Sequence, residues 1–426
     1  MVDIFVEQVS ERLIYTLDFI FKERDVPYKI INDFHLFNKS TNIKFNYSPK
    51  EVGCKVNIFP STFLYEEELR DIEVDLSIFE DEECLSFDKV VDPLASIFYI
   101  LSRYEEYVST KEDLHGRFLA KHSVQSDFNW LERVVCDVWS EKIIKYIEMK
   151  SGQKIIFNIG EVRIMPTFDI DNTFAYKWKK GIRKYLSIAK DKIKRDDNRL
   201  LERKEVLIGK VKDPYDTFDY IESITKKGFK VHVFWLLGDY SKYDKNISYL
   251  DLRHRSLINE VSINSIVGIH PSYKSNSFRK TIKVERGRLS EILERTINRT
   301  RQHFLRFSIP KTYPVLNDLG FKHEFSMGFP DKVGFRTGTA RPHFWFDLSR
   351  NKITSMMIHP FAYMDGTLNE YLKLTPEESK VKIQQLYHEV RRYGGDFVFI
   401  WHNETIGDYG KWKNWRDVLE FTLKLN

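Results

Sequence analysis

Apolar and polar positions follow two successive patterns along the chain, and the first extends to about residue 153. Helical spacing of apolar residues, together with a long apolar stretch that opens with Asp92-Pro93, predicts three helices: 11–24, 92–107 and 128–148. Proline suits the first turn of a helix, where its missing N–H is not needed. Two short segments that alternate or are β-branched predict strands: 55–58 and 73–78. These elements predict a smaller α+β or α/β domain over residues 1–153.

The second pattern begins at residue 154, where strand-like and helix-like segments alternate. The predicted strands are 162–168, 230–239, 265–273, 301–307, 356–365 and 396–403. The predicted helices are 213–228, 282–298, 312–320 and one that opens with the capping box 375–378. Repeated strand–helix units imply a parallel sheet or barrel, so residues 154–426 are predicted to form an α/β domain.

Composition narrows the class of protein. The 426 residues, 42% hydrophobic and 30% charged, suit a globular protein with more than one domain. The net charge of +5 is a small excess among 67 basic and 62 acidic residues, so it does not argue for nucleic acid. No apolar run approaches the roughly 20 residues that span a bilayer, and the N-terminus has acidic residues where a signal peptide has basic ones. We therefore expect a cytoplasmic protein without a transmembrane segment.

Polar residues at the ends of predicted strands mark a candidate site. Active residues of α/β barrels lie at the carboxyl ends of the strands. The polar residues that end the predicted strands most clearly are Asp169, Asp171, His270, His402 and Asn403, and other strands end near Arg306 and at Asp365. Two carboxylates and two histidines on one rim suit a metal and acid–base site.

Each of the four charged or titratable residues also has a plain structural interpretation. Asp169 and Asp171 can face one centre, where they repel unless a cation or a shared proton relieves them, but aspartate is also common in turns after strands. His270 and His402 suit metal binding or proton transfer, although a rim histidine is often only hydrogen-bonded. We favour the functional interpretation, because all four residues lie on the same rim.

Residues 177–212 are rich in lysine and arginine. Such a segment is able to bind an acidic polymer or phosphate headgroups. A solvated helical face is the favoured interpretation, so no specific nucleic-acid partner is predicted.

Four motifs in this order resemble those of the polysaccharide deacetylase superfamily (the NodB homology domain, carbohydrate esterase family 4). They are TFDID at 167–171, VGIHPSYKSN at 267–276, RQHFLRFSIP at 301–310 and FIWHN at 399–403. The resemblance covers about residues 154–426 and implies a distorted (β/α)₇ barrel. It implies that Asp169 is the general base, that Asp171 and His270 bind a metal ion, and that His402 is the catalytic acid. It further implies a divalent metal, with zinc the leading candidate, and an N-acetylated carbohydrate substrate.

Two features depart from the family pattern. The second motif of the family has a further histidine four residues after the first, and Lys274 stands there. A protonated lysine cannot bind a metal ion, so a third ligand must come from His303, His359 or Asn276, or the metal site is weakened or absent.

The second departure concerns the arginine of the third motif. Arg301 and Arg306 lie in the expected place, GFRTGT at 334–339 offers Arg336 as a rival, and Arg301, His303 and Arg306 cannot all face the site from one strand. The residues expected to contact substrate are Arg306, Arg336 and Asn403.

Several alternatives stay open. One alternative is a hydrolase of another non-peptide amide. A second is a catalytically lapsed protein that binds a glycan. A third, weaker alternative is nucleic-acid binding through residues 177–212. The N-terminal segments LSRYEEY (101–107) and DLHGRF (113–118) resemble an uncharacterised domain found ahead of such deacetylases in bacterial proteins, from which no function follows.

Overall fold

The computed structural model describes residues 1–179, 193 and 197–425. These residues form two compact units, each assembled from several chain segments. Unit 1 comprises Met1–Arg163, Phe307–Ala362 and Gln385–Phe397, and unit 2 comprises Ile164–Arg306, Tyr363–Gln384 and Val398–Asn426. Helices and strands are mixed in both, as the α/β prediction required.

Unit 1 begins with a small parallel sheet of order β2-β1-β3. Its strands are β1 (Val2–Phe5), β2 (Tyr28–Ile31) and β3 (Ile43–Asn46). The strand predicted over 55–58 is wrong: Asn57 forms only an isolated bridge with Asn46, and its side chain turns back to the Cys54 carbonyl. A second, antiparallel sheet contains β4 (Val74–Phe79), β5 (Glu82–Phe87) and β6 (Val90–Val91), which confirms the strand predicted over 73–78.

Helices α1 (Glu11–Phe21), α3 (Pro93–Ser102) and α6 (Val135–Ser151) surround the apolar core of unit 1. The predicted helix 92–107 is divided at Arg103, whose φ of 58° ends α3 before the short α4 (Glu105–Val108) begins. The predicted helix 128–148 starts later than expected, because turns occupy the residues before Val135. Shorter helices are α2 (Phe34–Lys39) and α5 (Val124–Asp127).

The later segments of unit 1 add α12 (Ile309–Asp318), β11 (His323–Glu324), β12 (His343–Asp347) and β13 (Lys352–Ile358). The strand predicted over 356–365 is two strands, β13 and β14 (Tyr363–Met364). Pro360 lies between them, and proline cannot donate to a strand ladder.

Six strands lie wholly or mainly in unit 2, in the order β10-β9-β8-β7-β15-β14. The strands not yet given are β7 (Val162–Ile170), β8 (His232–Trp235), β9 (Ile266–Ile269), β10 (Arg299–Thr300) and β15 (Gly395–His402). Strands β7 to β10 pair in parallel, as do β14 and β15. All of β8 is buried, as is typical of a parallel sheet covered on both faces. The large parallel sheet is established, whereas its closure into a seven-stranded barrel stays a prediction.

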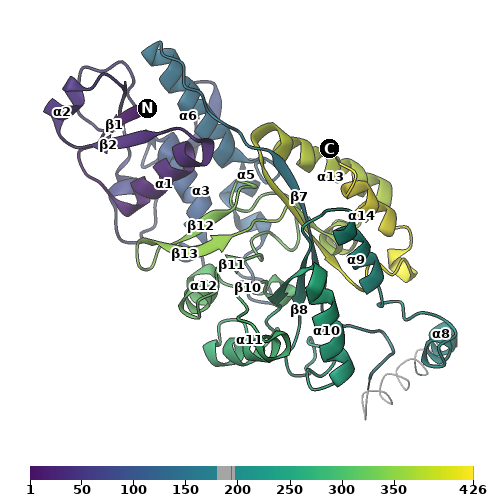
Figure 1. Ribbon diagram of the computed structural model, residues 1–426. Coiled ribbons are helices and arrows are strands. Elements are labelled where there is room, and N and C mark those ends of the chain that lie inside the picture. The colour runs from purple at the N-terminus through teal and green to yellow at the C-terminus, as the bar shows by residue number, and fades with distance from the viewer. Residues whose placement is uncertain (180–192, 194–196, 426) are drawn as a thin grey trace. The chain divides into compact units, whose positions relative to one another are not determined.

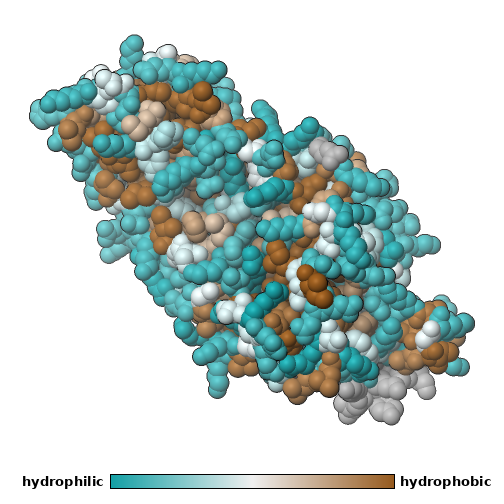
Figure 2. All heavy atoms as spheres, in the orientation of Figure 1, coloured by the Kyte–Doolittle hydropathy of each residue, from teal (hydrophilic) through white to brown (hydrophobic). Residues whose placement is uncertain are grey.

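Helices flank this sheet, and Figure 1 shows α9 (Phe218–Lys226) and α10 (Leu252–Asn264) side by side next to β8. The other helices are α8 (Asp197–Leu207), α11 (Arg279–Leu293), α13 (Pro376–Tyr393) and α14 (Arg416–Thr422). Helix α10 was not predicted, because only His254 and Ile258 of its residues are buried and an apolar stripe is missing. Among the described residues, no helix combines the length and apolarity needed to cross a membrane. The face drawn in Figure 2 is largely hydrophilic.

Candidate metal and acid–base site

The carboxyl ends of four strands from the run β10-β9-β8-β7-β15 in unit 2 bring a compact set of polar side chains together. Asp169 and Asp171 come from the end of β7, His270 follows β9, Arg301 and His303 follow β10, and His402 ends β15. Asp171, His270 and His303 each offer one ligand atom, and these atoms lie within 4.8 Å of one another. The expectation that functional residues lie at the carboxyl ends of the strands therefore located this region. His303 joins Asp171 and His270 as the third residue of the group.

A turn in the backbone explains how His303 reaches the site. The strand predicted over 301–307 is wrong: β10 ends at Thr300, and a 3-10 turn follows over His303–Leu305. Phe304 adopts a left-handed conformation in this turn, with φ 62° and ψ 11°. Because both residues lie beyond the end of β10, the alternation of side chains along a strand does not apply to them. Arg301 and His303 can therefore both face the candidate site.

Hydrogen bonds fix the tautomers of the two imidazoles. His270 Nδ1 donates to the Arg301 carbonyl over 2.6 Å, and His303 Nδ1 donates to Asp244 Oδ1 over 2.9 Å. Each Nε2 atom is thus left to face Asp171, at 3.2 Å from Oδ1 for His270 and 3.3 Å from Oδ2 for His303. Partners of this kind are what orient metal-binding histidines.

The donor set fits a cation. Asp171 Oδ1 is buried and accepts no hydrogen bond, although the His270 Nε2 atom lies close to it. Burial raises the pKa of Asp171, but the His303 and His270 imidazoles outweigh burial and hold it well below its usual range. Burial likewise lowers the pKa of His303, but Asp171 and Asp244 raise it to about 9. The pKa shifts of Asp171 and His303 both indicate a centre that favours positive charge, which a divalent ion on two nitrogens and one oxygen would supply.

Asp169 lies beside these ligands and is held by an arginine. Its Oδ1 accepts a hydrogen bond from Arg301 Nη1 over 2.8 Å, and its Oδ2 lies 3.7 Å from His270 Nε2. Arg301 is itself buried, with its guanidinium 4.5 Å from the Phe234 ring centroid. Asp169 is only 3% exposed, and this ion pair fixes the orientation of its carboxylate.

His402 is held by a carboxylate on its other side. Its Nδ1 donates to Asp365, 2.9 Å from Oδ1, and Asp365 Oδ2 also accepts from the His402 backbone N–H and from Thr405 Oγ1. Burial lowers the pKa of His402, but Asp365 outweighs it and raises that pKa well above its ordinary value. The protonated Nε2 faces Asp171 Oδ2 at 3.8 Å. A protonated imidazole is thereby held beside Asp171.

The remaining residues predicted to contact substrate have protein partners. Asn403 is buried and donates to the Tyr215 carbonyl, and Arg306 donates to the Tyr273 carbonyl. Arg336 belongs to unit 1, where it is 1% exposed and its Nε and Nη2 donate to Glu106. Arg306 therefore lies next to Tyr273, which belongs to the loop after β9.

The other two candidates for the third ligand have different neighbours. His359 belongs to unit 1, where its Nε2 is 3.0 Å from His323 Nδ1. Asn276 contacts its neighbour Ser277, and Lys274 is exposed. His303, in contrast, follows β10, the next strand along the chain after β9.

Three further acidic residues were not assigned roles from sequence. Asp365 ends a predicted strand, so the signal that singled out His402 was present for it as well. Asp244 lies in a loop without a local signal. Glu404 follows the last motif, and burial, then the nearby Asp171, raises its pKa to about 7.

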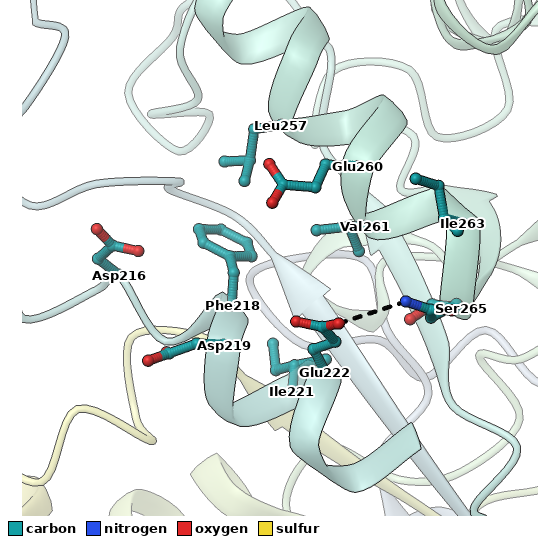
Figure 3. A pocket seen from close by; sticks show the side chains of 11 residues that line it. Asp216, Phe218, Asp219, Ile221, Glu222, Leu257, Glu260, Val261, Ile263 and Ser265 are labelled. Carbon is teal, nitrogen blue, oxygen red and sulfur yellow. Dashed lines mark hydrogen bonds between the residues drawn. The ribbon is translucent and has the colours of Figure 1, made fainter. Parts of the chain in front are cut away.

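Other features of unit 2 lack this chemistry. Figure 3 shows a pocket of about 380 Å³ between α9 and α10, where Glu222 accepts a hydrogen bond from Asn264. Its described lining contains carboxylates and apolar side chains but no histidine. Of the basic segment 177–212, residues 180–192 and 194–196 lie outside the described residues, while Lys177 and Lys212 pair with Asp216 and Asp219.

Comparisons with known proteins give one family match. A model described as a family of unknown function (DUF7033) matches residues 2–152. No curated protein matches the chain in sequence.

Solved structures give partial and distant similarities. A protein from Mycobacterium smegmatis described as a polysaccharide deacetylase has a TM-score of 0.42 at 14% identity, over 63% of this chain and 86% of that chain. A polysaccharide deacetylase from Bacillus cereus has a TM-score of 0.30 at 11% identity, over 62% and 85%. IcaB from Ammonifex degensii has a TM-score of 0.22 at 13% identity, over 39% and 85%. Structural similarity at these TM-scores and identities does not establish an activity.

Proposed function

We propose that this protein is a metal-dependent hydrolase that removes the acetyl group from an N-acetylated sugar. One observation carries the proposal: Asp171, His270 and His303 converge within 4.8 Å, with an arginine-bound Asp169 near His270 and a carboxylate-bound His402 near Asp171. The four sequence motifs that resemble polysaccharide deacetylases supply these same residues. A ligand triad flanked by a base and an acid is what hydrolysis of an unreactive amide requires.

Asp171, His270 and His303 would hold the ion, and two imidazoles with one carboxylate are a common catalytic zinc set. A divalent ion supplies Lewis acidity there, which polarises a carbonyl and lowers the pKa of water. Asp244 and the Arg301 carbonyl keep both Nε2 atoms directed at the centre. His303 thus takes the coordination position for which the family pattern has a histidine at Lys274.

Asp169 would accept the proton of the attacking water, while the hydrogen bond from Arg301 holds its carboxylate in place. His402 would donate its Nε2 proton to the amine nitrogen as the C–N bond breaks, since an amine leaves poorly unless it is protonated. Asp365 holds the imidazole in the tautomer that allows this. Arg306, half-buried beside Tyr273, is the remaining candidate for contact with substrate.

The test uses the full-length protein loaded with zinc and measures acetate released from N-acetylglucosamine oligosaccharides. Asp169→Asn should keep zinc binding and lose activity by roughly 10²–10⁴-fold, the usual contribution of a general base. Asp219→Asn, which lines the pocket of Figure 3, serves as the matched control and should behave like the native protein.

Two outcomes would count against the proposal. Near-normal turnover by Asp169→Asn would remove Asp169 as the base. A native protein that binds no divalent ion would favour a lapsed glycan-binding protein, and turnover of small acetamides without turnover of sugars would favour another amide substrate.

A further inference from the structure

Three aromatic side chains cluster beside the metal-ligand triad. Tyr243, Tyr273 and Phe304, here called the aromatic platform, come from the loops that follow β8, β9 and β10. The ring centroids of Tyr243 and Tyr273 are 4.1 Å apart, and the Phe304 ring lies 5.3 Å from the first and 5.4 Å from the second. Three consecutive strand-end loops thus contribute one ring each to a single surface.

The platform is fixed to the proposed metal site by a shared carboxylate. Asp244 Oδ1 accepts hydrogen bonds from the Tyr273 backbone N–H over 2.8 Å and from His303 Nδ1 over 2.9 Å. The Phe304 ring lies 4.8 Å from the His303 ring. When one sugar of an oligosaccharide lies on the platform, the adjacent sugar therefore lies beside the ligand triad.

Phe304 has a backbone conformation that is unfavourable for a non-glycine residue. Its φ of 62° and that of Leu305, 49°, are both in the left-handed region, which non-glycine residues rarely adopt. The ring is nevertheless 37% exposed, so burial of the side chain is incomplete. Strained backbone of this kind is typical of ligand-binding sites.

Cations surround the platform. The Arg306 guanidinium lies 4.5 Å from the Tyr273 ring centroid, and the Lys242 ammonium lies 5.1 Å from that of Tyr243. Lys274 follows Tyr273 directly and is exposed. Within the described part of the chain, neither Lys242 nor Lys274 has a carboxylate partner. The rim therefore presents positive charge that the protein itself leaves uncompensated.

We propose that the aromatic platform and its basic rim bind an acidic sugar next to the acetylated unit, so that the substrate is an N-acetylated glycan with carboxylate groups. This inference rests on the proposed function and names its substrate class. Sugar rings have apolar C–H faces that pack on exposed aromatic rings, which bury area at little entropic cost. A carboxylate on the same sugar meets Lys242, Lys274 and Arg306, which attract it electrostatically.

Binding by the full-length, zinc-loaded Asp169→Asn protein tests the proposal without turnover. The probes are a hyaluronan tetrasaccharide, in which N-acetylglucosamine alternates with glucuronate, and neutral chitotetraose. Hyaluronan should bind at least about tenfold more tightly at low salt, and salt should reduce the difference because exposed charges are screened. Calorimetry measures both affinities.

Variants separate the rings from the charges. Tyr273→Ala and Phe304→Gly should each weaken both probes by roughly five- to tenfold, whereas Lys274→Gln should weaken hyaluronan alone. Tyr240→Ala, whose ring faces Lys245 in the same loop, and Lys280→Gln on exposed α11 are matched controls that should change neither.

Stability provides an independent readout. Phe304→Gly relieves the left-handed strain, so it should raise the melting temperature while it weakens binding; a lower melting temperature with unchanged binding would show a packing role and overturn the proposal. Equal affinity for the two probes, or no binding of either by a protein that binds zinc normally, would also overturn it while the hydrolase function stands. Failure to bind zinc would instead remove the proposed function itself.

Discussion

At the scale of single residues, His303 depends on groups from three loops. Its backbone position comes from the turn after β10, its tautomer from Asp244 in the loop after β8, and its proposed partners from the ends of β7 and β9. A side chain with so many constraints is expected to be sensitive both to its own replacement and to that of Asp244. The same reasoning distinguishes it from His359, whose ring lies against His323 and Phe325 in unit 1.

Zinc affinity measured by calorimetry tests this arrangement. Asp244→Asn should weaken zinc binding by roughly 10–100-fold, the usual effect of removing a residue that orients a ligand. His303→Ala should weaken it further, because a ligand is lost. His359→Ala is the control and should bind zinc as the native protein does; a loss of affinity in that variant instead of in His303→Ala would reverse the assignment.

At the scale of elements, the caps decide where the helices of unit 1 start. Asp92 is buried at the N-terminus of α3, where Oδ1 accepts from the Leu94 and Ala95 backbone N–H groups. Its Oδ2 accepts from the Tyr47 hydroxyl and from Ser61. One carboxylate therefore starts a core helix and ties two distant segments to it.

Asp92→Ala should lower the free energy of unfolding by roughly 2–4 kcal/mol, since a cap is lost and several buried donors lose their acceptor. Asp33→Ala offers a matched comparison, because Asp33 caps the exposed helix α2 through the Leu36 N–H alone. It should cost only about 0.5–1 kcal/mol. Denaturant titration measures both, and equal costs would show that burial of the Asp92 network adds nothing.

Buried histidines should also make folding depend on pH. Burial lowers the pKa of His343 in β12 to about 4, from 6.5, because the protonated imidazole is poorly solvated there. Between these values the unfolded chain binds a proton that the folded chain does not, so the unfolding free energy falls as the pH falls. The loss is on the order of 3 kcal/mol over the interval.

His343→Gln should reduce this pH dependence, because glutamine can still donate to the Arg341 carbonyl but does not titrate. Exposed His388→Gln is the control and should leave the slope unchanged. Unfolding curves between pH 7 and pH 4 provide the measurement. An identical slope for native and His343→Gln proteins would contradict the prediction.

At the scale of the whole molecule, buried charges join parts of unit 1 that are far apart in sequence. Arg336 donates two hydrogen bonds to Glu106, which also accepts from Arg103, and Arg103 donates to the Arg336 carbonyl. All three side chains are buried. The segment around residue 336 is thereby fixed to the N-terminal segments of the same unit.

Arg336→Met should destabilise the protein by about 3–5 kcal/mol, because it leaves the Glu106 carboxylate with less compensation in a buried site. Adding Glu106→Gln to this variant should restore part of the loss. Arg350→Ala, which breaks an exposed ion pair with Asp318, should have little effect. Thermal unfolding compares the three, and a loss no greater than that of Arg350→Ala would show that the network is dispensable.

Apolar patterning along the chain was enough to predict the α/β class, more than half of the described helices and the strand ends where Asp169, Asp171, His270 and His402 meet. It was able to do so because apolar periodicity and capping are local, and because carboxyl ends of parallel strands share an edge. It failed where local signals were weak, as in α10, or misleading, as in the strand predicted over 301–307.

How these residues work together depends on tertiary contacts. The His303–Asp171 contact, the Arg301–Asp169 ion pair and the Asp365–His402 pair each join residues more than 30 positions apart. The position of His303 also depends on a left-handed turn at Phe304 that apolar spacing does not encode. Compact unit 1 likewise draws in residues 307–362 and 385–397, because side-chain packing follows distance in space rather than order along the chain.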